Sequence, residues 1–560
     1  MSRPARLAAL AAITLLGGWL RFASTDFGLP QLYRPDEQWV VPKARGFERD
    51  WNPGFAIYPA AQMVVQHGVL RAWAAWKAPA DRPWRTWYMQ DGEPLAYLLA
   101  RRTSAAMGTL TIPATWAAAS LYGGPLAGLA AAAIVAVTPL HVRDSKFATV
   151  DVAMVFWVAV ALWATMRVAR RGRVGDHGGA GLAAGLATAT KYPAAVAAVA
   201  IAAAHVGARR REGRSILRSW RDLRLWVAGY AFVAAFALAT PYFFLDWRET
   251  KESFEYQRGA FLSTSNPHQD GSGWRWLAGH AIPDGFGAEV GLLSLAAIAW
   301  ALHRRPPGSL ALLAMVAAAT SGLLRSATVY YRYALPLLPA LAILAGGLVA
   351  DVGGASAGTT ASRAGSRWRP WLASAALAAL LVPDLVRSVR SNALLARTDT
   401  RTLAREWILE HVPGDAKIAA TDMANPQGKP PLAGRNEMVA FEDVAQARAD
   451  GVGWVVSDSL PPLAYFSKGP TAAQQMDLDR EARLVFDVDP LVPGRPEPVF
   501  DRADGFYSPL RRIGAMARPG PRVRIWRIDP LPPPPGEPGV GVVAAPRPAT
   551  AGPLPAPPAP

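Results

Sequence analysis

The chain has 560 residues, no cysteine and a formal net charge of +17. The absence of cysteine excludes disulfide bonds and thiolate metal sites. A strong positive charge can indicate a nucleic-acid partner. Here, however, the arginine clusters lie between apolar runs, as they do in the cytoplasmic loops of membrane proteins. We therefore expect no nucleic acid to bind.

Apolar runs recur along the first 390 residues, whereas the rest of the chain is polar and rich in proline. Runs of about 18 or more apolar residues are typical of membrane spans. We predict an all-α polytopic membrane domain of about eleven spans, many of them rich in alanine. The candidate spans are residues 6–22, 102–121, 125–140, 152–167, 178–190, 193–206, 226–244, 286–302, 308–324, 333–350 and 370–388.

The first apolar run follows the basic start MSRPAR, an order that is also found in signal peptides. No small-residue cleavage site follows this run, and further spans do. We interpret it as an uncleaved first helix, with a removed signal peptide as the alternative.

The loop after this helix contains the motif RPDEQW, with Asp36 and Glu37 directly after a proline. Such a pair can simply be a solvated acidic start of a helix, because carboxylates stabilise the first helical turn. The same loop contains residues 55–76, in which Gln62, Gln66, His67 and Arg71 have the spacing of an amphipathic helix. We expect that segment to lie on the outer membrane surface.

Arginine clusters give the predicted orientation, because positively charged loops face the cytoplasm. The stretch 178–206 lies between two such loops, so it must cross outward and return, and Lys191-Tyr192-Pro193 is the natural break. The N-terminus is then cytoplasmic, and residues 23–101 form the first outer loop. The four clusters are Arg167 with Arg170, Arg171 and Arg173; Arg209, Arg210, Arg211, Arg214, Arg218, Arg221 and Arg224; Arg304 with Arg305; and Arg363, Arg367 and Arg369.

Because successive spans cross the membrane in alternate directions, further polar residues are expected on the outer face. They lie in the loops 141–151 and 245–285, at the tip of the 178–206 hairpin and at the boundary beside residue 332. Asp151 stands at the very start of an apolar run, where an ionisable group is costly and often functional. Arg332 lies between Tyr331 and Tyr333. The residues singled out are Arg143, Asp144, Asp151, Lys191, His268, Asp270 and Arg332.

Beyond the last span, residues 391–530 contain a helical pattern closed by Pro413-Gly414, and strand candidates at 417–420, 453–457 and 523–528. We predict a small extracytoplasmic α/β domain there. Residues 531–560 are proline-rich and of low complexity, so we expect them to be disordered.

Several of these segments resemble the GT-C superfamily of polyprenyl-phosphate-dependent glycosyltransferases, including protein O-mannosyltransferases and the lipid A aminoarabinose transferase of the family 39 kind. The resemblance lies in the acidic pair of the first outer loop, in RRTSAAMGTLTIPATWAAASLYGG through HVRDSKFATVD, and in GLATATKYPAA and YYRYALPLLPALAILAG. It covers residues 1–390 and continues more weakly into TDTRTLAREWI. It implies the GT-C fold, a lipid-linked sugar donor and inversion at the anomeric carbon.

In that resemblance the catalytic acidic residues of the two outer loops match Asp36, Glu37 and Asp151. Asp36 is our candidate general base, since a carboxylate near the acceptor hydroxyl can take its proton, and Glu37 is its supporting or metal-side partner. Cations near the membrane surface would stabilise the departing lipid phosphate: Lys191, Arg332 and Arg143. His268 and Asp270 are weaker candidates for contact with acceptor or lipid.

Each of these residues also has a simpler interpretation. Lys191 could extend to the interface, Arg332 could anchor there beside its tyrosines, and Asp151 could cap its helix or pair with Arg143. Asp144 fits a salt-bridge partner better than a catalytic group, and His268 and Asp270 could belong to a flexible polar loop.

No cofactor is certain from the sequence. A divalent metal ion is conceivable, held by Asp36 and Asp151, because hard cations prefer oxygen ligands. The expected partners are the bilayer, a polyprenyl-phosphate sugar donor and a glycan, lipid or protein acceptor. We expect a multi-pass protein of the plasma (inner) membrane with an extracytoplasmic active site. A transporter or lipid flippase is the alternative function, and a scaffold that presents the outer domain is a third.

Overall fold

The computed structural model describes residues 2–77, 93–262, 273–324, 330–354, 368–423, 429–432, 434–459, 469–501 and 506–528. The chain forms two compact units. The first contains Met1–Ala396, Val499–Ala503 and Pro509–Ile513, and the second contains Arg397–Pro498, Asp504–Ser508 and Gly514–Pro560. The predicted domain boundaries at 390 and 530 stay predictions, and residues 531–560 lie outside the described part.

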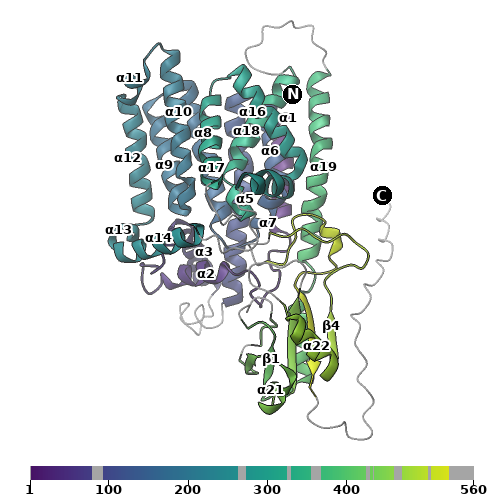
Figure 1. Ribbon diagram of the computed structural model, residues 1–560. Coiled ribbons are helices and arrows are strands. Elements are labelled where there is room, and N and C mark those ends of the chain that lie inside the picture. Colours follow the sequence, from purple (N-terminus) through teal and green to yellow (C-terminus); the bar gives the residue numbers. More distant parts are fainter. Residues whose placement is uncertain are drawn as a thin grey trace. The chain divides into compact units, whose positions relative to one another are not determined.

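The first unit is built from helices (Figure 1). At each of the eleven predicted spans there is a helix: α1 Arg3–Phe22, α5 Glu93–Gly123, α6 Pro125–Val137, α8 Asp151–Arg171, α9 Val174–Thr190, α10 Val196–Arg211, α12 Leu223–Ala239, α16 Ala288–Arg304, α17 Ser309–Leu324, α18 Leu337–Val352 and α19 Arg369–Leu395. The shorter connecting helices are α2 Glu37–Gly46, α3 Ala61–Lys77, α7 Pro139–Asp144, η1 Tyr192–Ala195, α11 Ile216–Trp220, α13 Tyr242–Leu245, α14 Trp247–Leu262, α15 Gly273–Trp276, η2 Leu277–Gly287 and η3 Tyr331–Ala334.

Five segments of the described chain are long and apolar enough to cross a membrane, namely Arg3–Phe22, Asp151–Arg171, Tyr192–Arg211, Gly273–Arg304 and Arg369–His411. Shorter apolar helices accompany them, among them α6, α12, α17 and α18. The chain is thus a multi-pass membrane protein. That all eleven segments cross the bilayer stays a prediction.

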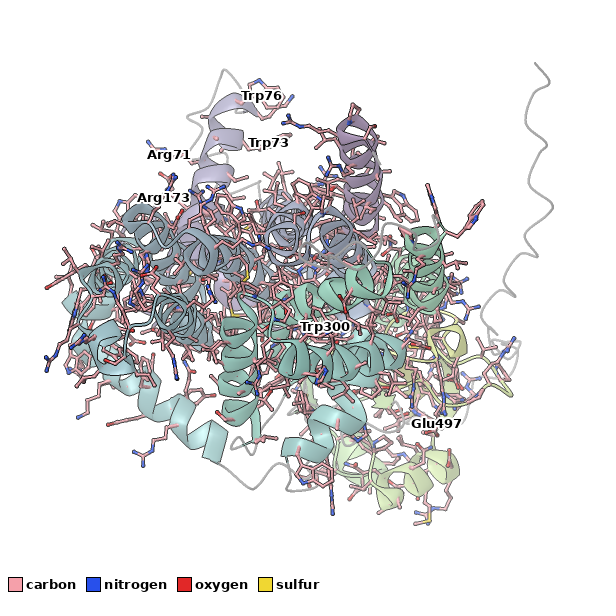
Figure 2. All side chains as sticks on the ribbon, turned by 90° about the horizontal axis from the view of Figure 1, so that it is seen from above. Arg71, Trp73, Trp76, Arg173, Trp300 and Glu497 are labelled. Carbon is pink, nitrogen blue, oxygen red and sulfur yellow. The ribbon has the colours of Figure 1, made fainter. Side chains whose placement is uncertain are left out.

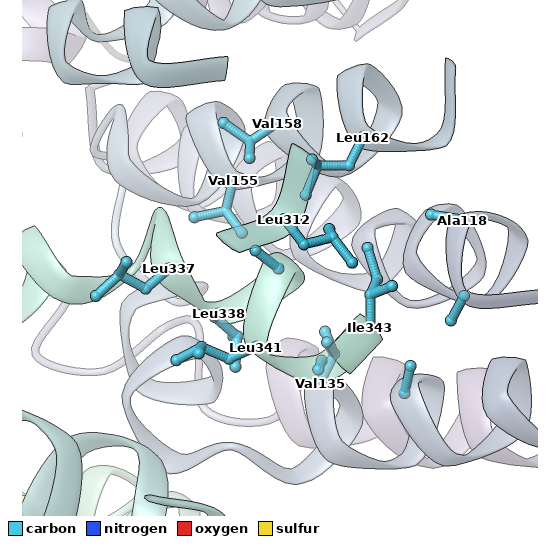
Figure 3. Packing of buried hydrophobic residues seen from close by; sticks show 14 of the residues in the cluster. Ala118, Val135, Val155, Val158, Leu162, Leu312, Leu337, Leu338, Leu341 and Ile343 are labelled. Atoms are coloured by element: carbon cyan, nitrogen blue, oxygen red, sulfur yellow. The ribbon is translucent and has the colours of Figure 1, made fainter. Parts of the chain in front are cut away.

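Small residues let the helices of this unit approach closely. Gly181 and Gly185 lie one turn apart on α9, and a Cβ at either would collide with a backbone carbonyl of α12, that of Ala228 or of Phe232. Such contacts between small residues are the usual way to pack helices in lipid, where the hydrophobic effect gives little help. Larger residues fill the centre, where Val135, Leu162, Leu312, Leu338 and Ile343 are buried together (Figure 3).

The predicted break in the 178–206 stretch is present. Helix α9 ends at Thr190, Lys191 has an extended backbone, and Pro193 lies in the short 3₁₀ turn η1 before α10 begins. The helical arms have 17 and 16 residues, longer than the 13 or so that the sequence suggested because both helices continue into the basic loops.

The amphipathic helix forms as α3, but its polar side faces the protein rather than water. Gln62, Gln66 and His67 are buried, and His67 Nδ1 lies 3.0 Å from the Ala44 carbonyl oxygen. The exposed side carries the valines at 64, 65 and 69 together with Arg71 and Trp76, two residues labelled in Figure 2. An exposed apolar side fits a lipid environment. Its position at the membrane surface stays a prediction.

The second unit contains a five-stranded sheet in the order β2-β1-β3-β5-β4, in which β1 is parallel to β2 and β3, and β5 is antiparallel to β3 and β4. The strands are β1 Ile418–Ala420, β2 Met438–Ala440, β3 Trp454–Ser459, β4 Arg483–Val488 and β5 Arg522–Arg527. Helices α20 Thr400–His411, α21 Val444–Ala449 and α22 Ala472–Glu481 accompany the sheet. The sequence pattern found β1, β3, β5 and α20, but it missed β2 and β4.

After the fourth strand the chain contributes to the first unit again. Val499 and Arg511 form a β-bridge there. Asp501 accepts a hydrogen bond of 3.0 Å from the backbone amide of Tyr331, and Arg511 lies 3.2 Å from Asp284. This late segment is therefore part of the structure around η3.

Candidate functional site

Four predicted site residues from four separate segments meet in the first unit. Asp36 stands just before α2, Asp151 begins α8, Lys191 links α9 to η1, and Arg332 lies in η3. Arg332 Nη1 is 2.7 Å from Asp36 Oδ2, and Lys191 Nζ is 2.5 Å from Asp151 Oδ1. These two ion pairs, with the rings described below, form what we call the acidic–basic cluster.

The three candidate carboxylates differ in access. The side chain of Asp36 is 22% exposed, whereas that of Asp151 is 2% and that of Glu37 is 0% exposed. Asp36 is the N-cap residue of α2 but its side chain makes no cap hydrogen bond, and Arg34 Nη2 approaches it to 3.6 Å. Asp36 is thus the carboxylate of this set that a substrate can reach.

Glu37 is held in a buried pair with Arg101 of α5. Arg101 donates from Nε to Oε1 at 2.8 Å and from Nη2 to Oε2 at 2.7 Å, and the backbone amide of Ala148 donates to Oε1 at 2.8 Å. A bidentate arginine is among the strongest ways to fix a carboxylate. Through these bonds Glu37 ties the start of α2 to α5 and to the loop before α8.

Two tyrosine rings border the ammonium group of Lys191. Its Nζ lies 5.5 Å from the centroid of Tyr58 and 5.1 Å from that of Tyr333, distances at which a cation is attracted to an aromatic face. Burial, and then the negative charge of Asp36, raises the pKa of Tyr58 well above 10. The Tyr58 phenol therefore stays protonated and can donate a hydrogen bond at neutral pH.

Two hydrogen bonds of Tyr331 hold the turn that carries Arg332. Asp501 accepts from the amide of Tyr331, and the Tyr331 hydroxyl donates to Asp284 at 3.2 Å. The guanidinium group of Arg332 lies 4.3 Å from the ring centroid of Tyr330. Arg332 is 5% exposed, so its charge points into the protein and toward Asp36.

Arg143 lies close to the cluster. Its Nε donates to Asp144 at 2.8 Å, and its guanidinium group and that of Arg34 both lie against Phe147, at 5.8 and 4.8 Å from the ring centroid. Asp144 is thus the salt-bridge partner that the sequence suggested, whereas Asp151 pairs with Lys191 and not with Arg143. His268 and Asp270 lie outside the described residues.

Sequence reasoning missed Arg34, Tyr58 and Arg101. Arg34 could have been suspected because it stands two residues before Asp36 in the same motif. Arg101 could have been suspected because a buried glutamate needs a cation, and an arginine at the end of an apolar run is a suitable one. Tyr58 gives no comparable signal, since its position depends on how the loop 47–60 folds.

A divalent metal ion does not fit this donor set. In the described part of the chain no three His, Asp or Glu side chains lie close enough to share a metal ion. Asp36 and Asp151 each face a cationic side chain instead.

Comparisons with known proteins agree with this architecture. Residues 98–243 match the family model of dolichyl-phosphate-mannose-protein mannosyltransferases. None of the curated proteins compared with this chain matches it.

Two solved structures resemble the chain over most of its length. ArnT from Cupriavidus metallidurans, bound to undecaprenyl phosphate, has 15% identity and a TM-score of 0.50, covering 95% of this chain and 100% of that one. The oligosaccharyltransferase of Archaeoglobus fulgidus, tethered with an acceptor peptide, has 13% identity and a TM-score of 0.50, covering 82% of this chain and 69% of that one. The resemblance drawn from the sequence is confirmed: the chain has the fold of the GT-C superfamily of membrane glycosyltransferases.

Proposed function

We propose that this protein is an integral membrane glycosyltransferase that moves a sugar from a polyprenyl-phosphate-type lipid to an acceptor, with inversion at the anomeric carbon. The observation that carries the proposal is the acidic–basic cluster: one reachable carboxylate beside two cations, Lys191 and Arg332, that come from separate segments. The GT-C fold supports it, as does the match of residues 98–243 to a family of lipid-linked sugar transferases.

Asp36 acts as the general base in this proposal. The acceptor hydroxyl attacks the anomeric carbon and forms the new C–O bond, while the bond from that carbon to the phosphate oxygen breaks. The hydroxyl proton goes to Asp36, and the electron pair of the broken bond leaves with the lipid phosphate. A single displacement of this kind inverts the anomeric centre. The side chain of Asp36 is exposed enough for a general base to reach its substrate, whereas the side chains of Glu37 and Asp151 are buried.

Lys191 and Arg332 bind the donor phosphate and stabilise the charge that it gains on leaving. Arg332 lies 2.7 Å from Asp36. A phosphate competes for that guanidinium group, because arginine binds phosphate at least as well as carboxylate. Binding of the donor would thus draw Arg332 from Asp36 and leave this carboxylate free to accept the proton of the acceptor hydroxyl.

Asp151 and Glu37 serve as positioning residues. Asp151 holds the Lys191 ammonium group at 2.5 Å, and Glu37 holds Arg101 and the Ala148 amide. Arg143, whose guanidinium group lies near Phe147 as that of Arg34 does, is a further candidate for binding the donor phosphate. The residues of the cluster belong to loops that charge counting assigns to the outer face. We therefore propose an extracytoplasmic reaction, with the N-terminus in the cytoplasm of a cell whose plasma (inner) membrane contains the protein.

The first prediction tests the base. Purified wild type and Asp36→Asn, in liposomes, are given undecaprenyl phosphates that carry single hexoses or pentoses, together with a membrane extract as acceptor. Release of free undecaprenyl phosphate reports transfer whatever the acceptor is. We expect Asp36→Asn to lower the rate about 10²- to 10⁴-fold, the usual contribution of a general base, with an unchanged melting temperature.

Asp26→Asn is the matched control, since Asp26 is an exposed residue of the same loop, and it should keep the wild-type rate. Full activity of Asp36→Asn would contradict the base assignment. Movement of the lipid across the bilayer without any new glycosidic bond would instead favour a transporter. The anomeric configuration of the product, measured by NMR, tests inversion separately.

A further inference from the structure

A strongly basic segment, residues 209–224, joins α10 to α12 and takes no part in the reaction proposed above. It contains the short helix α11, which Figure 1 shows at the far end of α10 and α12 from α13 and α14. Lys191 of the acidic–basic cluster lies before the start of α10, whose 16 residues are about 24 Å long at 1.5 Å per residue. The segment is therefore a helix length away from the cluster.

The inner side of α11 is fixed to the helices beside it. The buried Ser219 has its carbonyl oxygen 3.0 Å from Nε2 of His205 on α10, and Nδ1 of His205 lies 2.8 Å from Nε2 of His177 on α9. At the start of α12, Arg224 donates to the Gly172 carbonyl oxygen at 3.0 Å. These contacts hold α11 in place, so its other side is presented at the ends of the membrane helices.

The segment has more cations than it can neutralise by itself. Seven arginines stand against two carboxylates, Glu212 and Asp222. Both carboxylates already contact arginines: Glu212 lies 2.7 Å from Arg209, and Asp222 lies 3.6 Å from Arg214. Three further arginines are exposed, and their side chains form no ion pair or hydrogen bond within the described part of the chain: Arg210, Arg218 and Arg221.

Large apolar side chains are exposed among these arginines. On α11, Leu217 is 66% and Trp220 is 50% exposed, and Ile216 is about equally open. Leu223 and Trp226 continue this exposed apolar side into α12. Arginines beside exposed leucine and tryptophan are typical of a helix that lies in the interface of a bilayer. The position of α11 between the ends of two apolar helices fits that environment.

An anionic phospholipid is the partner that matches both kinds of side chain. Arginine binds phosphate through two parallel hydrogen bonds, and the acyl chains below the phosphate cover the apolar residues. A nucleic acid or a free phosphate ion would match the arginines but leave Leu217 and Trp220 in water. Each arginine near an anionic membrane surface strengthens binding about fivefold.

We infer that α11 and the arginines around it bind anionic phospholipid headgroups of the leaflet at their end of the spans. Arg210, Arg218 and Arg221 contact the phosphates, while Leu217 and Trp220 lie among the upper parts of the acyl chains. Charge counting assigns this end to the cytoplasm. The inference goes beyond the proposed sugar transfer, because the surface binds lipid whether or not a sugar is moved.

The second prediction tests this surface with the triple variant Arg210→Gln, Arg218→Gln and Arg221→Gln of the full-length protein. In detergent, wild type and variant are titrated with dioleoyl phosphatidylglycerol and separately with dioleoyl phosphatidylcholine, and native mass spectrometry counts the bound lipids. We expect the wild type to prefer phosphatidylglycerol. The variant should bind it about 10²-fold more weakly at the tightest site, since three cations are lost, and should bind phosphatidylcholine as before.

Two further variants separate charge at this place from charge in general. A control triple removes the same charge from three exposed arginines of the second unit and should keep the wild-type affinity: Arg480→Gln, Arg483→Gln and Arg495→Gln. Replacement of the three arginines around α11 by lysine keeps the charge and should weaken binding far less than glutamine does. If the glutamine triple does not fold, Arg218→Gln alone should lower the affinity about fivefold.

The apolar part of the surface distinguishes a lipid from other anions. Leu217→Ser with Trp220→Ser should weaken phosphatidylglycerol binding although every arginine remains. Unchanged affinity in that variant would show a contact of charges alone and overturn the assignment to a lipid. Competition by a single-stranded oligonucleotide, lost in the glutamine triple, would assign the surface to nucleic acid instead. Equal phosphatidylglycerol affinity in the folded glutamine triple and the wild type would also overturn the inference.

Discussion

Asp36 and Glu37 are neighbours in sequence whose carboxylates meet opposite environments. Asp36 precedes the first turn of α2 and stays partly exposed, whereas Glu37 enters the helix and turns inward onto Arg101. A buried ion pair adds little net stability, but breaking one member leaves a charge without compensation. Replacing Glu37 is therefore expected to lower the stability only in a variant that keeps Arg101.

The third prediction belongs to this scale. Glu37→Gln leaves the Arg101 guanidinium group buried beside a neutral amide, and we expect it to cost about 3–5 kcal/mol of stability. Glu37→Met with Arg101→Met removes both charges and should recover most of that loss. Thermal unfolding in detergent measures both effects. If the double variant is no more stable than the single one, the pair does not act as a unit.

At the residue scale the sequence predicted which side chains to examine but not their partners. Charge counting put Asp36, Asp151, Lys191 and Arg332 on one face of the membrane, and in the structure they are joined in pairs. That Asp151 pairs with Lys191 rather than Arg143 depends on how α9 ends against α8. No spacing within one segment contains that information.

At the scale of elements, the apolar runs located the helices because membrane helices must be long and apolar. Short strands gave weaker signals: β2 has three residues and β4 begins directly behind α22. The sequence also did not show that the polar side of α3 faces the protein. An amphipathic pattern defines two sides of a helix but not which one faces lipid, and here Gln62 and Gln66 face the protein.

The fourth prediction concerns the packing of α9 on α12. Gly185→Ala places a methyl group against the Phe232 carbonyl and the Ala235 side chain, so the helices must separate. We expect a loss of about 1–3 kcal/mol, typical of overpacking. Gly179→Ala on the same helix has open space around the new Cβ and is the control. Thermal unfolding that does not distinguish the two variants would contradict this packing.

At the scale of the whole molecule, residues 499–501 and 509–513 belong to the first unit, although most of the chain just before them belongs to the second. Asp501 and Arg511 contact Tyr331 and Asp284, about 170 and 230 positions earlier in the chain. The sequence could not predict this return. The segment has no strong periodicity, and it lies where a soluble domain was expected.

The fifth prediction follows from that contact. Asp501→Ala removes the acceptor of the Tyr331 amide and loosens the turn that carries Arg332. We expect transfer activity to fall about tenfold, the effect of leaving a buried donor without its partner, while circular dichroism stays unchanged. Asp415→Ala, at an exposed site of the α/β unit, should keep full activity. Wild-type activity of Asp501→Ala would show that η3 holds Arg332 without this bond.

The same hydrogen bond has a consequence for the folding of the protein during its synthesis. A ribosome makes Tyr331 and Arg332 long before it makes Asp501. The membrane helices can therefore be inserted before the hydrogen bond between the Tyr331 amide and Asp501 can form. Chains interrupted before residue 501 would carry every carboxylate and cation of the cluster and yet hold Arg332 loosely. Only chains extended beyond residue 501 can form this hydrogen bond, so we expect full transfer activity only from them.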